Sequence, residues 1–376
     1  MSLAAPQPER SASSGLRARL RAPGLRWRAM PVAAPWAVAL VLLVISVILY
    51  PATVHYGGMA TVTPLLGVLV IASLGQSLVI GSGGIDLSVS SVITIVGVVF
   101  VLQGGTRGGS VTLAIVYALL TGLACGVVNG FLVEYLRLSP LVTTLATGEV
   151  MAGLASIWYG GGTNNLVVPK SWQQFTGDAF GDGISYVLVI AMVAALLLSV
   201  VLSYTALGRR LTAASTSSRA AGYQGISPRR YRAANYVVAA LLYSVAGILF
   251  VGDIGTATLS LGDVYQLSTI VAVVLGGAAL SGSRLHPAAT VAGALFLSLI
   301  NQDVAASGIA AGTQGVIQGA VLVAAMAATG LGTLRSIRRR SLRRPAAPPP
   351  ASSPLAATPL AETEAASPTD LGPSAP

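Results

Sequence analysis

The stretch GSGGIDLSVSS, residues 81–91, places one carboxylate among glycines and serines between two long apolar runs. The glycines, Gly83 and Gly84 among them, allow the backbone to leave helical geometry. Asp86 then caps a new helix that begins directly after it, and Ser88 shares in the cap. We therefore predict a helix break at this stretch. Contact of Asp86 with a substrate and coupling to a partner subunit are the two alternatives.

Four further polar side chains interrupt apolar runs: Asn129, Thr144, Glu149 and Asn301. An ionisable residue within a membrane span has to face protein or water. For Glu149, the hydroxyls of Thr144 and Thr147 are the candidate partners. We interpret the four residues as candidates for the wall of a polar pathway, with interhelical hydrogen bonding as the structural alternative.

Catalytic and metal-binding chemistry finds no support in the sequence. The two histidines, His55 and His286, are far apart, and the single cysteine, Cys125, lies in an apolar run. A phosphate-binding loop needs Gly-Lys followed by Ser or Thr, whereas the one lysine, Lys170, follows a proline. We therefore expect no catalytic residues, no metal site and no cofactor in this chain, and expect any ATP to be bound by a partner.

The composition indicates a membrane protein. Of the 376 residues 54% are hydrophobic and only 9% are charged, against about 25% charged in a soluble domain. About 20 apolar residues cross a bilayer as a helix, and the runs are apolar on every face, so we predict an all-α polytopic fold. Ten spans are expected, at residues 35–54, 60–80, 86–104, 110–133, 140–159, 185–205, 232–252, 265–280, 287–301 and 314–333. The spans 265–280 and 287–301 are the short ones.

The arginines predict the orientation. They gather in residues 1–30, 209–232 and 335–344, and cytoplasmic segments collect Arg and Lys. Even numbers of expected spans separate the three clusters, so both termini are expected in the cytoplasm. The net charge of +10 is thus a topology signal, and no nucleic-acid partner is expected.

Three regions follow from this pattern. Residues 1–30 form a basic cytoplasmic segment, and residues 31–335 form the transmembrane domain. Residues 336–376 are basic at first and then rich in Pro and Ala, a composition typical of a disordered tail. The stripe Gly122, Gly126 and Gly130, like that of Gly312, Gly315 and Gly319, is typical of a helix-packing face.

The segment 208–230 is a long cytoplasmic connection with a short helix expected around Thr212–Tyr223, since Ser227-Pro228 marks a new break. Such a helix suits the docking of a soluble partner. A solvated connector with orienting arginines is the equally weighted alternative.

These features, taken in order, resemble the membrane permeases of ribose-type ABC sugar importers. The resemblance rests on GSGGIDLSVSS, on GVVNGFLVEYLRLSPLVTTLATG at residues 126–148, on the segment 208–226, and on LSTIVAVVLGGAALSGSRLHPAATVAGAL at residues 267–295. It covers nearly all of residues 35–333. Its signature residues are Gly83, Gly84, Asp86 and Ser88.

The resemblance implies a transport subunit of the cytoplasmic membrane that imports a monosaccharide. A cytoplasmic ABC ATPase, an extracytoplasmic sugar-binding protein and a second permease subunit are its implied partners. The residues implied to face the ATPase are Gly208, Arg209, Ala220, Ala221, Gly225 and Ile226.

The chain also departs from the family pattern. Ser215-Thr216-Ser217 replace Gly-Gly-Asn, and Gln266-Leu267-Ser268 replace Glu-Leu-Asp. Another solute of the same permease class, such as a nucleoside or a branched-chain amino acid, is therefore the first alternative. An ion-coupled secondary transporter with Glu149 as its proton carrier is the second.

Overall fold

The computed structural model describes residues 26–106, 109–160, 167–181, 183–216, 218–278 and 285–308, with single positions between 313 and 327. The tail 336–376, residues 1–25 and most of the tenth expected span lie outside this part of the chain.

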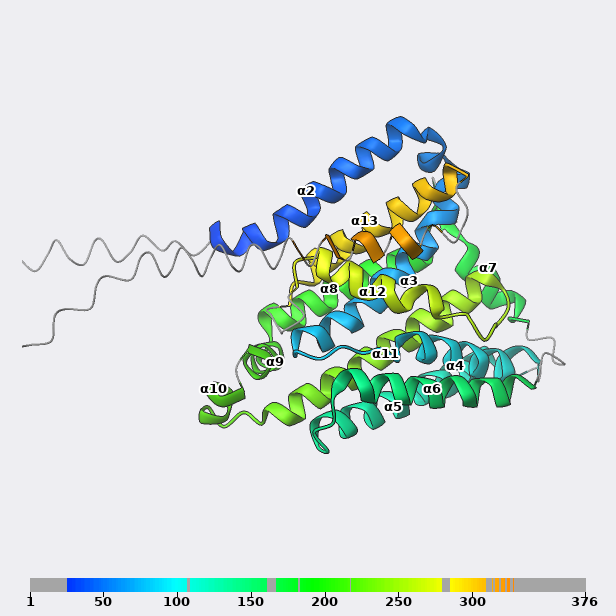
Figure 1. The fold of residues 1–376 in the computed structure, drawn as a ribbon. Helices are drawn as coiled ribbons and strands as arrows, with labels where there is room; N and C mark the ends of the chain where they lie inside the picture. Colours follow the sequence, from blue (N-terminus) through cyan, green and yellow to red (C-terminus); the bar gives the residue numbers. More distant parts are fainter. Residues whose placement is uncertain are drawn as a thin grey trace, which may run out of the picture. The chain divides into compact units, whose positions relative to one another are not determined.

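The regular elements of the described residues are helices and one short hairpin (Figure 1). The long helices are α2 (Arg26–Leu49), α3 (Tyr56–Gly81), α5 (Val111–Glu134), α6 (Pro140–Tyr159), α8 (Tyr186–Tyr204), α11 (Pro228–Ile254) and α13 (Pro287–Ala306). Each of these seven is long and apolar enough to cross a membrane. The shorter elements are η1 (Pro51–Val54), α4 (Val89–Val101), η2 (Leu102–Thr106), α7 (Lys170–Gly177), α9 (Ala206–Thr216), α10 (Ser218–Tyr223), α12 (Asp263–Leu275), β1 (Ala179–Phe180) and β2 (Ile184–Ser185).

Nine of the ten expected spans fall on described helices, and several of these helices differ in length from the expectation. The span expected at 287–301 is not short, because α13 continues to Ala306 as a helix of 20 residues. Conversely, α12 has only 13 residues and ends at Leu275, because Gly276 and the positive φ of Gly277 (85°) stop the helix. The first helix begins at Arg26, before the expected start at residue 35.

Helix α3 is the central element of the bundle. Its residues from Leu66 to Gly81 are buried, and it packs against α8, α11, α12 and α13. Two glycines permit close approach: a side chain at Gly67 would meet the backbone of Val187, and one at Gly75 would meet the Tyr243 ring. A helix that is apolar on every face is stable only when it is surrounded in this way.

The glycine stripe of α5 packs against α11. A side chain at Gly122 would meet Ser244, one at Gly126 would meet Ala240, and one at Gly130 would meet the backbone of Ala233. The packing face predicted from Gly122, Gly126 and Gly130 is therefore confirmed.

The outer helices expose their large apolar side chains. Val41 of α2, Leu120 of α5, Ile157 of α6 and Leu196 of α8 are all more than half exposed. Bare leucines and valines over several helices suit a hydrocarbon environment and would aggregate in water.

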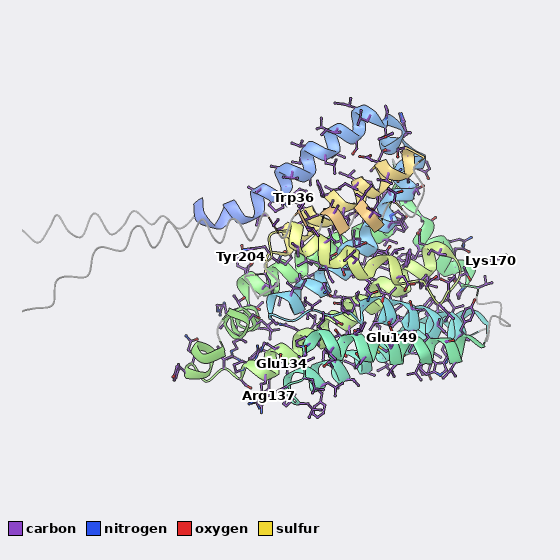
Figure 2. The ribbon with its side chains drawn as sticks, in the orientation of Figure 1. Trp36, Glu134, Arg137, Glu149, Lys170 and Tyr204 are labelled. Carbon is purple, nitrogen blue, oxygen red and sulfur yellow. The ribbon has the colours of Figure 1, made fainter. Side chains whose placement is uncertain are left out.

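The two ends of the bundle carry different features. Helices α9 and α10 lie at the end where α3 finishes and α11 begins, whereas α7 lies at the opposite end (Figure 1). Glu134 and Arg137 lie near the first end and Lys170 at the second (Figure 2). Arg232 Nε and Glu134 Oε2 form an ion pair of 3.2 Å that ties α11 to α5.

Candidate functional site

The helix break predicted at residues 81–91 is present. Helix α3 ends at Gly81 and α4 begins at Val89, and the residues between them are not helical. The Gly84 N–H donates to the Val79 carbonyl (3.1 Å) and the Gly83 N–H to the Ile80 carbonyl (2.9 Å). With Gly83 at φ 84°, this is the glycine-based helix termination called a Schellman motif.

Gly84 lies beneath a buried tyrosine. A Cβ at Gly84 would come within 2.5 Å of the Tyr236 hydroxyl and 3.2 Å of Val79 Cγ1. Tyr236 is 1% exposed, and its hydroxyl forms no hydrogen bond with any described residue. The second glycine of the signature is thus required for space, and the first for its backbone conformation.

Asp86 is buried, with 1% of its surface exposed. Its Oδ1 accepts hydrogen bonds from the Ser88 N–H (2.9 Å) and the Ser88 hydroxyl (2.6 Å). The helix begins at Val89 and not at Leu87, so the carboxylate binds the turn that precedes the helix rather than the helix's own free N–H groups. The hydrogen bonds of Asp86 are thus made within the turn, and α4 begins only after Ser88.

A polar network extends from this turn to α5. Asn129 of α5 donates from Nδ2 to the Ser88 hydroxyl (2.9 Å). The Thr147 hydroxyl of α6 in turn donates to Asn129 Oδ1 (2.5 Å). Asn129 is 1% exposed, so both ends of its amide are paired inside the protein.

The same turn is also fixed by α6 and α12. The Leu87 N–H donates to the Thr144 hydroxyl (2.9 Å), whose proton reaches the carbonyls of Pro140 (2.9 Å) and Ile85 (3.2 Å). Gln266 of α12 donates from Nε2 to the Leu87 carbonyl at 3.4 Å. Buried networks of this kind stabilise one arrangement strongly because each unpaired group is costly.

Glu149 lies away from this network. It is exposed on α6 (Figure 2), on the face opposite to Thr144, Gly148 and Met151. The pairing predicted between Glu149 and Thr144 or Thr147 is therefore wrong, since those hydroxyls bond to the turn and to Asn129. Five residues along a helix turn the side chain through about 140° relative to the first, which separates Thr144 from Glu149.

The segment 208–230 contains two helices. The helix expected around Thr212–Tyr223 is divided into α9 and α10, and α9 already begins at Ala206. A side chain at Gly208 would meet the backbone of Val201 and Leu202, which explains a glycine where α9 folds onto the end of α8. Arg209 is exposed, with Nη1 donating to the Tyr204 carbonyl (3.3 Å).

Helix α10, which contains Ala220, also ends in a Schellman motif. The Ile226 N–H donates to the Ala221 carbonyl (3.0 Å) and the Gly225 N–H to the Gly222 carbonyl (3.0 Å), with Gly225 at φ 72°. Ala221 is 1% exposed. Three of the residues identified by resemblance therefore define where this short helix stops.

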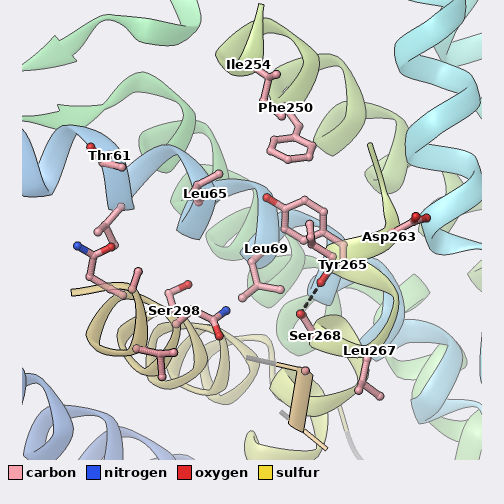
Figure 3. Close-up of a pocket in the computed structure, with 17 residues that line it drawn as sticks. Thr61, Leu65, Leu69, Phe250, Ile254, Asp263, Tyr265, Leu267, Ser268 and Ser298 are labelled. Carbon is pink, nitrogen blue, oxygen red and sulfur yellow. Dashed lines mark hydrogen bonds between the residues drawn. The ribbon is translucent and has the colours of Figure 1, made fainter. Parts of the chain in front are cut away.

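A cavity of about 950 Å³ lies between α3, α11, α12 and α13 (Figure 3). Asn301, Gln302, Asp263, Ser298 and Thr61 supply its polar groups. Leucines and the rings of Phe250 and Tyr265 line the rest of it, and these two rings meet edge to face with centroids 4.9 Å apart. Of the four candidate pathway residues, the structure places Asn129 and Thr144 at the helix break, Asn301 at this cavity and Glu149 on the outer face of α6.

Sequence reasoning missed Tyr236, Asn235 and Thr147 as members of the site. Each contacts the break or its network from a helix remote in sequence, and no local pattern marks it. The sequence did mark Gln266, because it stands where the family pattern has a charged residue. Within the described ranges no three His, Cys, Asp or Glu side chains gather closely enough to hold a metal ion.

Comparison with known proteins gives matches over most of the chain. The family described as "Branched-chain amino acid transport system / permease component" matches residues 58–326. A probable ABC transporter permease protein of Sinorhizobium fredii is 35% identical over 77% of this chain and 86% of its own length. The ribose import permease protein of Bacillus subtilis is 30% identical over 68% of this chain and 79% of its own. The fructose import permease protein of Bifidobacterium longum is 31% identical over 64% of this chain and 68% of its own length. No solved structure matches.

Proposed function

The chain belongs to the family of branched-chain amino acid transport system permease components, and we propose that it carries a monosaccharide of the ribose, xylose or galactose type. It is a multi-pass protein of the cytoplasmic membrane and a permease subunit of an ABC transport system. Its role is transport, and the energy comes from a partner.

The solute class rests on one observation. The relatives named for a solute include permeases for ribose, fructose and galactose or methyl galactoside, at 29–31% identity. All three solutes are small sugars that carry several hydroxyl groups. Permeases for them can therefore share the same recognition chemistry.

The cavity beside α13 supports a place for such a solute. Its volume of about 950 Å³ is within the range of roughly 300–1,000 Å³ of small-molecule sites. Asn301, Gln302 and Ser298 offer donors and acceptors for hydroxyl groups. The rings of Phe250 and Tyr265 offer apolar surface for the C–H face of a sugar, so Asn301 is a proposed pathway contact.

The partners take opposite ends of the bundle. An ABC ATPase, which binds the ATP, docks at α9 and α10, where Arg209 is exposed and Tyr223 is 92% exposed. A sugar-binding protein delivers the solute at the end that carries α7 and Lys170. We further propose that ten spans cross the membrane, that both termini lie in the cytoplasm and that the tail 336–376 is a cytoplasmic extension.

A second permease subunit covers the outer face of α6. Glu149 is exposed there at the middle of an apolar helix, together with Ala146 and Gly153. A carboxylate facing lipid at this depth costs several kcal/mol or more, so protein or water must meet it. Asn129 and Thr144 stay proposed pathway residues, exposed to solute only when the network at the break opens.

Two alternatives are separable by measurement. The family's own description names branched-chain amino acids, so leucine is tested beside ribose, xylose and galactose. An ion-coupled transporter would need no ATPase and would use Glu149 as its carrier.

The test is purification of the full chain from its native membrane in mild detergent, with identification of the proteins that copurify. We expect a P-loop ATPase and an extracytoplasmic binding protein, and expect calorimetry of that binding protein to show a monosaccharide as its tightest ligand. A binding protein that prefers leucine would overturn the solute class, and reproducible absence of the ATPase would overturn the ABC mechanism.

A further inference from the structure

The hydroxyl of Ser82 lies where three helices meet. It donates to the Leu78 carbonyl of α3 (3.0 Å) and accepts from Asn235 Nδ2 of α11 (2.5 Å). The Ser215 hydroxyl of α9 lies 3.5 Å from it. A hydroxyl has one proton and two lone pairs, so Ser82 is fully used when Ser215 donates to it.

Apolar packing fixes α9 at the same place. Ala214 is 1% and Leu211 is 8% exposed. Leu211 packs with Leu78 of α3 and Leu202 of α8. Leu211, Ala214 and Ser215 follow the spacing of one helix face. One face of α9 is therefore packed into the bundle, mainly against α8 and α11, with Ser215 beside Ser82 at the end of α3, and Arg209 and Arg210 of α9 are exposed.

Ser82 is also the first residue of the break. Gly83 and Gly84 follow it, and Asp86 begins the network that reaches Asn129 and Thr144. The contact with Ser215 thus joins α9 directly to the first residue of the break.

Resting on the proposed function, we propose that Ser215 is a positioning residue that transmits movement of α9 to the helix break through the Ser82 hydroxyl. When the ATPases move α9, Ser82 and the turn after it move with it, and the network at Asp86 is rearranged.

The experiment uses the copurified complex in proteoliposomes and measures solute transported per ATP hydrolysed. Ser215→Ala removes the hydroxyl and keeps the helix, Ser215→Thr retains a hydroxyl, and Ser82→Ala removes the other partner. Ser199→Ala is the control, because the Ser199 hydroxyl bonds only to the Ala195 carbonyl of its own helix (2.7 Å).

We expect Ser215→Ala to lower the transport-to-ATP ratio by between about twofold and thirtyfold, the range for residues that carry coupling. Ser215→Thr and Ser199→Ala stay near wild type, and the double variant Ser82→Ala/Ser215→Ala is no worse than Ser82→Ala alone. If Ser82→Ala fails to assemble, the comparison of Ser215→Ala with Ser215→Thr decides. An unchanged ratio for Ser215→Ala in a complex whose wild type transports would overturn this inference alone, whereas a wild-type complex without ATP-driven transport would overturn the proposed function.

Discussion

Asp86 stabilises a turn, and its neighbours show why an acceptor oxygen is needed there. One oxygen accepts both the N–H and the hydroxyl of Ser88, and the side chains of Asp86 and Ser88 are both buried. Ser88 then has its hydroxyl oriented to accept from Asn129. A chain of two successive hydrogen bonds therefore begins at this side chain and ends on α5.

Replacement of Asp86 tests this role. Asp86→Ala leaves the Ser88 N–H unpaired, at a cost of about 1–3 kcal/mol for each buried group, and we expect a lower melting temperature and lost uptake. Asp86→Asn keeps an oxygen acceptor and retains most of both. The melting temperature in detergent is the measurement, with the exposed Asp178→Ala as control. Normal stability with lost uptake in Asp86→Asn would instead assign the charge to solute binding.

Gly84 and Tyr236 form a second test at this scale. Gly84→Ala forces a methyl group against the Tyr236 hydroxyl, and strain of this kind in a packed interior costs about 1–3 kcal/mol. Tyr236→Phe alone is expected to be nearly neutral, because that hydroxyl bonds no described residue. The double variant Gly84→Ala/Tyr236→Phe regains part of the lost melting temperature.

The control for this pair is Gly177→Ala, whose added Cβ meets nothing within 4 Å. No recovery in the double variant would show that the Tyr236 hydroxyl is not the contact that requires glycine at residue 84.

The break could be predicted from the sequence because its cause is local. Glycines and one acid between apolar runs are a pattern within eleven residues, 81–91. The partners Asn129, Thr147 and Tyr236 could not be joined to it, since their contacts depend on how α5, α6 and α11 pack. The error over Glu149 was avoidable, because helical spacing already places it opposite to Thr144.

At the scale of elements, α9 and α10 differ in how far their side chains are buried. Helix α9 is packed into the bundle through Leu211 and Ala214, whereas Tyr223 at the end of α10 is almost fully exposed. The sequence indicated a helix here but placed its start too late, because the bend at Thr205 that separates α8 from α9 carries no glycine or proline.

Reversing one exposed charge tests this surface. Arg209→Glu is expected to abolish ATP-driven uptake and copurification of the ATPase, because the side chain is exposed and its loss breaks no internal contact except one bond to the Tyr204 carbonyl. Arg137→Glu, an exposed arginine on the loop after α5, is the control and retains both. Normal uptake by Arg209→Glu would remove this surface from the ATPase contact.

At the scale of the molecule, the bundle has a buried axis and an exposed periphery. Helices α3 and α11 form the axis, and α6 is attached through α4 and α5 alone among its larger contacts. Helix α6 packs on one face only, and the carboxylate on its other face needs protein or water beside it within a membrane. Composition and apolar runs predicted the fold class and the positions of nine described helices, but which helix is peripheral depends on packing and was not predictable.

Crosslinking tests the pairing of two permease subunits. In a Cys125→Ala background, Glu149→Cys is expected to give a dimer with a short bifunctional maleimide in native membranes. Leu196→Cys, at a position on α8 that is 64% exposed, is expected to give none. Equal crosslinking at both sites would indicate random collision, and none at residue 149 would place the second subunit elsewhere.

The most direct measurement is uptake of a radiolabelled monosaccharide into proteoliposomes that hold this chain and its ATPase, with the loaded binding protein outside and ATP enclosed. The account predicts uptake that requires all three proteins, stops with a non-hydrolysable ATP analogue and continues after proton and sodium gradients are dissipated. Uptake by this chain alone, driven by an ion gradient without ATP, would contradict it.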